Sequence, residues 1–234
     1  KPTNTRQARP AQAGRIMEGQ KMNERKELER RSYNFEARAE KDDQGGSVIV
    51  GRPIVYDQVT DLGYFDEVIE RGALDKANLQ DVRFLVNHDT SKIPLARSRK
   101  NNKNSTMQLT VDNDGMAIRV TLDTENNADA RSLYSAVERG DLSGMSFMFS
   151  IDDEEWEDLE SDHPKRQIKK IGTVVEVSAV TFPAYEQTEI STRCKAELDS
   201  ARDAVDTAKK KQRASVDTEE LELERLKAKY LYKI

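Results

Sequence analysis

Hydrophobic and polar residues alternate along most of the middle of the chain, and this two-residue period is the pattern of β-strands. Residues 47–56, 81–88 and 168–183 each predict a strand, and Pro53 favours a bulge or an edge position in the first of them. From residue 145 to 151, large apolar side chains alternate with Ser146, Met148 and Ser150. This run also predicts a strand, with a small hydroxyl set among large apolar neighbours.

Two further signals concern a turn and a helix. Residues 106–111 and 116–122 flank Asp112-Asn113-Asp114-Gly115, which predicts a β-hairpin because Asn and Gly tolerate positive φ. Asn127 is a suitable cap for a helix over residues 128–139, whose apolar residues recur at three- and four-residue spacing. Residues 72–79 favour a short helix, and the acidic residues 152–165 favour a loop. Together these elements predict an α+β fold that is mainly β.

The two ends of the chain differ from its middle. Residues 1–32 contain few large apolar side chains, so they predict a disordered or leader segment, followed by a domain over residues 33–192. Residues 193–234 predict a helical tail. Its apolar positions Leu198, Ala201, Val205 and Ala208 follow a heptad spacing, and the basic residues 209–213 are expected to break it. The tail is either a solvated helical hairpin or linker, or an oligomerising or scaffold-like coiled coil.

Composition narrows the class of protein. Of the 234 residues, 35% are charged and 36% hydrophobic, so part of the chain is expected to lie outside a core. The net charge of −5, with both signs interspersed, argues against a nucleic-acid-binding surface. No apolar run reaches the ~20 residues that span a bilayer, so no membrane partner is expected. Cys194, the single cysteine, allows no internal disulfide and fits a reducing, intracellular compartment.

Three residues on separate predicted strands carry candidate chemistry. Ser146 follows Gly144 and is either a buried packing residue or a nucleophile. His88 ends an apolar strand and is either a hydrogen-bonded structural residue or a general base, whereas His163 lies in a polar loop and is expected to be solvated. Glu176 lies between valines and either faces solvent at a strand edge or orients the histidine.

Metal and cofactor chemistry is not expected. No second His or Cys stands at ligand spacing from His88, His163 or Cys194. Gly45-Gly46 lacks the Lys-Ser/Thr and the helix of a phosphate-binding loop.

Four segments together resemble the tailed-phage prohead (capsid maturation) proteases of the HK97-like assembly system. They are residues 65–74, the Val-Asn-His-Asp of residues 86–89, residues 140–149 with Gly-Met-Ser-Phe-Met-Phe, and residues 175–185. The resemblance covers about residues 33–192, and it is specific because the four segments occur in the same order. Met148 stands where the family usually has Gly, which is expected to crowd the strand beside Ser146.

The resemblance implies a small antiparallel β-barrel surrounded by helices, similar to herpesvirus assemblins. It implies that His88 and Ser146 are the base and the nucleophile, and Glu176 is the acid carried over as third member. It also implies a serine endopeptidase that works without a cofactor in the host cytoplasm, inside the assembling prohead. Its partners would be the major capsid protein or scaffold and further copies of itself. The alternative is a catalytically silent scaffold or capsid-assembly protein that acts through its helical tail.

Overall fold

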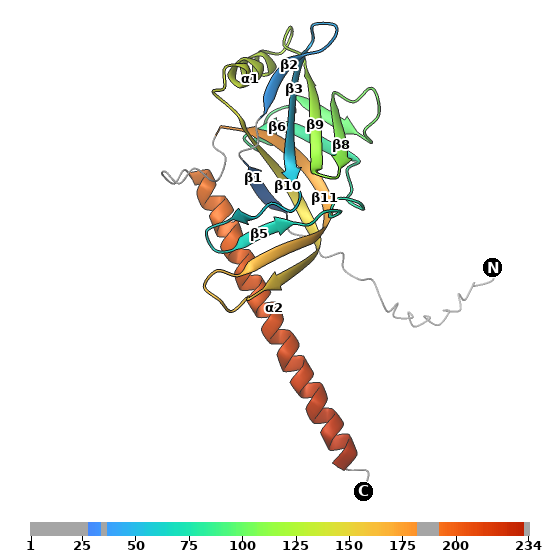
Figure 1. Ribbon diagram of the computed structural model, residues 1–234, viewed down its shortest axis with the longest axis vertical. Coiled ribbons are helices and arrows are strands. Elements are labelled where there is room, and N and C mark those ends of the chain that lie inside the picture. Colours follow the sequence, from blue (N-terminus) through green and yellow to red (C-terminus); the bar gives the residue numbers. More distant parts are fainter. Residues whose placement is uncertain (1–27, 34–36, 182–191, 232–234) are drawn as a thin grey trace, which may run out of the picture.

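Two β-sheets and two helices make up the residues that the computed structural model describes, which are 28–33, 37–181 and 192–231 (Figure 1). The expected α+β class with a predominance of strands is confirmed. Most of residues 1–32 lie outside the described residues. The last part of that segment does not, because a strand begins at Glu29, four residues before the expected start of the domain.

The larger sheet has seven strands within the described residues. Five follow the order β1 (Glu29–Tyr33), β10 (Gly144–Glu157), β11 (Lys165–Val180), β5 (Asp66–Ile69) and β4 (Thr60–Asp61). The long strand β11 pairs in parallel with β5 at its beginning and with β6 (Asp81–Val86) at its end. The edge strand β7 (Ala96–Arg99) then pairs with β6. Strand β11 is therefore the element that joins every part of this sheet.

The smaller sheet contains four described strands, all antiparallel. They follow the order β2 (Arg38–Lys41), β3 (Ser47–Val55), β9 (Gly115–Leu122) and β8 (Met107–Asp112). The predicted hairpin is confirmed as β8 and β9, and the register of β3 shifts between Gly51 and Ile54, around Pro53. Gly115 has φ of 136°, and a Cβ there would lie 2.0 Å from the Ile54 carbonyl oxygen, so the hairpin needs glycine at this position.

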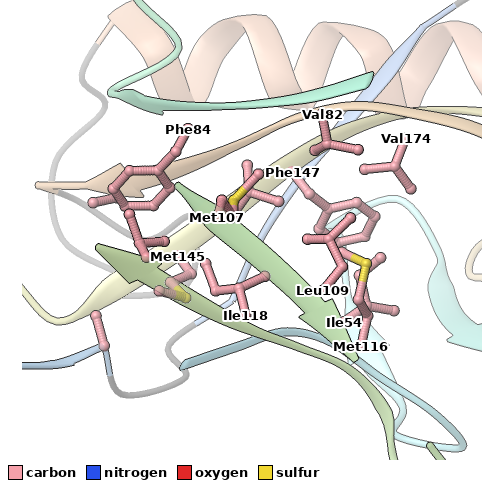
Figure 2. Close-up of a cluster of buried hydrophobic side chains, with 14 of the residues drawn as sticks. Ile54, Val82, Phe84, Met107, Leu109, Met116, Ile118, Met145, Phe147 and Val174 are labelled. Atoms are coloured by element: carbon pink, nitrogen blue, oxygen red, sulfur yellow. The ribbon is translucent and has the colours of Figure 1, made fainter. Parts of the chain in front are cut away.

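The described strands form these two sheets, and no closed barrel is found among them. The barrel of herpesvirus-protease type therefore stays a prediction. The two sheets enclose one hydrophobic core between them. Figure 2 shows side chains from β8 and β9 meeting those from β6, β10 and β11. Met107 and Ile118 from the smaller sheet and Phe84, Phe147 and Val174 from the larger one are all buried in one hydrophobic cluster.

Helix α1 (Ala128–Glu138) has the predicted position and cap. The Asn127 side chain accepts hydrogen bonds from the backbone N–H groups of Asp129 and Ala130. The apolar face of the helix, with Leu133 and Val137, is buried in the main core. Residues 72–79, by contrast, form successive turns rather than the expected helix, with backbone bonds such as Asp75 N–H to the Gly72 carbonyl.

Helix α2 (Thr192–Leu231) is one continuous helix of 40 residues, so the expected break at residues 209–213 is wrong. Lys, Gln, Arg and Ala are all good helix formers, and a basic run among them does not end a helix. Ala201 of this helix is buried against Leu62 and Phe65, and these three residues form a second hydrophobic cluster. Trp156 and Val205 also pack against this cluster. Among the described residues, neither helix is apolar over enough of its length to cross a membrane.

The distal part of α2 projects away from the two sheets (Figure 1). Ala208 is the last buried residue of the helix, and beyond the half-buried Lys209 its side chains are exposed, including Leu221, Leu223, Leu226 and Tyr230. This is a single helix and not the helical hairpin considered from the sequence. Whether its exposed apolar residues meet another chain stays a prediction.

Half of the acidic segment 152–165 is strand, so the expected loop is confined to residues 158–164. Strand β10 continues to Glu157 and β11 begins at Lys165, and residues 158–164 connect them. The charges are tolerated because they pair across the two strands, Asp153 with Lys170 at 2.7 Å and Glu155 with Lys169.

A buried ion-pair network joins β1 to β5 and β11. The Arg31 guanidinium donates to both carboxylate oxygens of Glu67, at 2.5 and 2.7 Å, and to Glu29 at 2.5 Å. The Arg166 guanidinium donates to both oxygens of Glu29 at 2.8 Å, to Glu67 at 3.2 Å and to Glu154. Burial opposes the charge of Glu29, but the two guanidinium groups outweigh it and lower the pKa of Glu29 from 4.5 to about 2.

This network predicts a specific acid sensitivity. Because the folded-state pKa of Glu29 lies below its unfolded value, its contribution to stability is present above about pH 4.5 and is lost as the pH falls towards 2. We expect Glu29→Gln to lower the free energy of unfolding at pH 7 by about 2–3 kcal/mol. The difference from the natural chain should shrink between pH 4.5 and 2, as measured by urea denaturation.

Glu40→Gln is the matched control, because Glu40 forms an exposed pair with Arg119 at 3.5 Å. Its effect at pH 7 should be small. An equal loss in the two variants would show that the buried network does not stabilise the fold.

Candidate active site

Strand register places two of the candidate side chains, Ser146 and Glu176, on one face of the larger sheet. Ser146 on β10 lies opposite Ser178 on β11, and Met148 lies opposite Glu176. Directly paired residues in an antiparallel sheet point to the same face, and residues two apart on one strand do so as well. Phe147 and its partner Val177 point to the opposite face and into the core. The alternation of side chains along β10 therefore places Ser146 on one face of the sheet and Phe147, which packs in the core, on the other.

His88 is held by a tight turn after β6. Asn87 and His88 have φ of 54° and 58°, the left-handed region that few non-glycine residues occupy. The turn is attached to the end of β11. The Asn87 backbone N–H donates to the Ala179 carbonyl at 2.9 Å, and its side chain exchanges hydrogen bonds of 3.0 Å with the backbone and hydroxyl of Thr181. The strained backbone directs His88 back over β11.

The imidazole of His88 meets the carboxylate of Glu176. Nδ1 lies 2.5 Å from Oε1, and both side chains are buried, with exposed fractions of 9% and 2%. Ser178 supports both groups, because its hydroxyl donates to Glu176 Oε2 at 2.6 Å and accepts from the His88 backbone N–H at 3.0 Å. With Nδ1 directed to the carboxylate, the second ring nitrogen Nε2 is the one left for chemistry. It is buried and has no hydrogen-bond partner in the part of the chain that the structure describes.

The hydroxyl of Ser146 is engaged elsewhere. It is fully buried and donates to the Arg31 carbonyl of β1 at 2.9 Å. Strand β1 pairs with β10 over the whole segment from Met145 to Phe149, with Ser32 opposite Ser146. Ser146 therefore lies directly opposite Ser178 in the sheet, but its hydroxyl donates to β1 and not to the imidazole of His88.

The structure therefore brings His88 and Glu176 into contact and places Ser146 on the strand beside them. Asp89, the other acid near His88, accepts from the backbone and hydroxyl of Ser91 at 3.1 and 2.6 Å. Ser178 was missed from the sequence. Its signal was available, because Glu176 and Ser178 stand two apart on one predicted strand and must share a face.

A second polar group lies far along the chain, around His163. Its Nε2 is 3.1 Å from Asp66 Oδ1 and 3.7 Å from Asp61 Oδ1, and these side chains are substantially exposed. Among the described residues they are the one group whose atoms approach closely enough to share a metal ion, but exposed acids gather in this way without one. A cavity of about 1000 Å³ beside this group, between the β10–β11 turn and α2, contains none of His88, Ser146 or Glu176 in its lining.

A buried carboxylate, an imidazole fixed by it and a serine on the neighbouring strand are the parts of a serine hydrolase site. The sequence comparison agrees with that class. Residues 33–202, more than two thirds of the chain, match the model of the caudovirus prohead serine proteases, and the chain belongs to this family. It is thus a phage capsid maturation protease.

Two other comparisons add no evidence for the family. No curated protein matches the sequence. Among solved structures, the bacteriophage T4 capsid assembly protease, gp21, is similar at 13% sequence identity, with a TM-score of 0.34 over 66% of this chain and 99% of that chain. A TM-score this low supports no structural argument, so the family membership depends on the sequence match.

The Ser178 hydroxyl gives a prediction that does not depend on activity. Ser178→Ala would leave the His88 backbone N–H and one oxygen of Glu176 without their partner, so we expect a loss of about 1–3 kcal/mol in the free energy of unfolding. The amide resonance of His88 should shift in NMR spectra. Ser91→Ala, at an exposed position in the same loop, should do neither. An unchanged His88 amide in Ser178→Ala would contradict the hydrogen bond.

Proposed function

We propose that this chain is a serine endopeptidase in which Ser146, His88 and Glu176 act together. The observation that carries the proposal is the buried contact of 2.5 Å between His88 Nδ1 and Glu176 Oε1, on the face of the sheet that also bears Ser146. A buried histidine and carboxylate stabilise a fold no more than a well-packed pair of apolar side chains would. Their burial is therefore better explained by catalysis.

The proposed reaction follows from the two ring nitrogens. Glu176 accepts the hydrogen of Nδ1 and so leaves the lone pair of Nε2 free. Nε2 takes the proton of the Ser146 hydroxyl as the oxygen attacks the scissile carbonyl, and later returns it to the leaving amine. The Glu176 carboxylate keeps the ring in one orientation and stabilises the imidazolium between the two steps. Ser178 positions both partners through its two hydrogen bonds.

One rearrangement is required before attack. Ser146 donates to the Arg31 carbonyl, so its hydroxyl has to leave that acceptor and donate to His88. Because the Ser146 side chain is fully buried, a peptide reaches it only after part of the covering structure has moved. The described conformation is thus a resting one in this proposal, and it opens transiently in solution, so that a small probe or a peptide can reach the serine.

The substrates we propose are the scaffold or the N-terminal extensions of capsid protein, cut inside the assembling prohead in the host cytoplasm, and then the protease itself. Support comes from the description of the family as prohead proteases. The exposed apolar residues of distal α2 favour contact with scaffold, capsid protein or further copies of this chain.

The rival function is a catalytically silent scaffold that acts through α2. The two functions predict different reactivity of the Ser146 hydroxyl oxygen. A fluorophosphonate forms a covalent adduct with an activated serine and not with an ordinary one, so it distinguishes them.

We expect a fluorophosphonate to label the natural chain, and Ser146→Ala and His88→Ala each to abolish labelling and proteolysis. Glu176→Gln should lower kcat by orders of magnitude with a smaller effect on KM. The double variant Ser146→Ala/His88→Ala should be little worse than either single one, because the three residues act as a unit. Intact-mass measurement of the adduct and a peptide-cleavage assay provide the two readouts.

Ser143→Ala is the matched control, since it removes a hydroxyl three residues away on the approach to β10. It should be labelled like the natural chain. Full activity in Ser146→Ala would move the nucleophile to Ser143 or Ser150 and overturn the assignment.

Self-processing is a further expected outcome, with cuts before Glu29, in the segment outside the described residues, and in α2 beyond Ala208. Residues 209–213 are helical rather than the break in the heptad pattern that the sequence predicts. Beyond the half-buried Lys209, however, that part of the helix is exposed, and an unsupported helix unwinds locally at low cost. Mass spectrometry of an aged sample should show discrete fragments ending in these regions.

The same fragments should be absent from Ser146→Ala stored alongside. Identical intact masses in the two samples, under conditions where the natural chain cuts another substrate, would exclude self-processing.

A further inference from the structure

We propose that a cavity beside the His88 turn binds an apolar side chain of the peptide substrate. The inference rests on the proposed proteolytic function and adds a substrate feature to it. The cavity measures about 220 Å³ and lies between the end of β6, the loop that follows His88, helix α1 and Leu142. Its walls thus come from the two chain segments that lead to the proposed base and the proposed nucleophile.

The register of the larger sheet relates the cavity to the site. Ser146 lies opposite Ser178, and Ser178 lies opposite Leu85, which is a lining residue of the cavity. The three side chains therefore form one row across β10, β11 and β6, on the face away from Phe147 and Phe84. With strands 4.7–4.9 Å apart, Leu85 lies about 10 Å from Ser146, which is the length of roughly three residues of extended peptide.

The lining defines the chemistry of the occupant. Most of the wall is aliphatic, with Leu85, Leu95, Leu133, Ala136 and Leu142. The charged groups are Asp89 and the exposed pair of Lys92 and Asp129, whose side chains meet at 3.1 Å between the loop and α1. A carboxylate or ammonium group pushed among the aliphatic residues would lose its hydration, so the cavity favours an apolar group.

The size of the cavity indicates one side chain rather than a separate small molecule. Sites for drug-sized ligands usually measure about 300–1,000 Å³, and this cavity is smaller. Leucine, isoleucine, methionine and phenylalanine are the side chains that match it in both size and polarity. An ordinary packing defect is a weaker explanation, because protein interiors rarely leave apolar space of this size unfilled.

The test fills the cavity without touching the proposed catalytic residues. Cleavage of a mixture of unrelated denatured proteins, read by mass spectrometry, should show Leu, Ile, Met or Phe enriched at one fixed position within about three residues of the cut. Ala136→Phe should lower kcat/KM for a fluorogenic peptide carrying Leu at that position by roughly 10–100-fold. It should leave the rate of fluorophosphonate labelling within about twofold, since the small probe does not need the cavity.

Ala128→Phe is the matched control, because it makes the same change at an exposed position of the same helix that does not line the cavity. It should cleave the Leu peptide like the natural chain. Ser132→Phe repeats the test from an exposed lining position, where a large side chain does not disturb the core.

The outcomes separate the two proposals. Absence of fluorophosphonate labelling in the natural chain overturns the proteolytic function, and the subsite with it. Labelling and cleavage without any apolar preference overturn the subsite alone. Unchanged cleavage of the Leu peptide by both Ala136→Phe and Ser132→Phe, each confirmed as folded by its labelling, also overturns the subsite.

Discussion

The pairing of β10 with β11 is the constraint on which the rest of the structure depends. These are the two longest strands of the larger sheet, and their register decides which residues face the core and which face the site. A shift of one residue would exchange the two sets completely, because side chains alternate along a strand. Phe147 and Val177 in the core fix the register, and Ser146 and Ser178 take the other face as a consequence. The same packing that stabilises the sheet therefore positions the chemistry.

Strand β11 extends this constraint to the remaining elements. Its first residues pair with β5 and its last with β6, so the turn that holds His88 begins where β6 ends beside Ala179. The buried network of Arg31, Arg166, Glu29 and Glu67 acts at the other end of the strand, and it attaches β1 to β5 and β11. Arginine suits this role because its planar guanidinium binds two carboxylates at once, which a lysine does not do in the same geometry.

Local patterns in the sequence predicted the elements well and their partners poorly. The hairpin around Gly115, the helix capped by Asn127 and the strand around Ser146 all depend on nearby residues, and all three are confirmed. The acidic end of β10 was expected to be a loop, because its charges become acceptable only when β11 pairs with them. The role of Ser178 and the network around Arg31 also depend on contacts between distant segments. The candidates His88 and Glu176 were found from residue type and resemblance, but their contact required the fold.

The contact between Ser146 and Arg31 has a consequence for how activity would be controlled. Arg31 contributes its carbonyl to the serine hydroxyl and its guanidinium to the buried network, so one residue of β1 joins the proposed nucleophile to the ion pairs. Glu29 and Arg31 bring one negative and one positive charge to that network. If β1 left the sheet, both charges would leave together, and Arg166 would keep Glu67 and Glu154 as partners. Separation of β1 from the sheet would therefore not leave a single unpaired charge buried, which would be strongly unfavourable. The fold combines a rigid histidine and carboxylate with a covering strand whose removal is electrostatically balanced, so in the proposed mechanism β1 is the part of the fold that can move to expose Ser146.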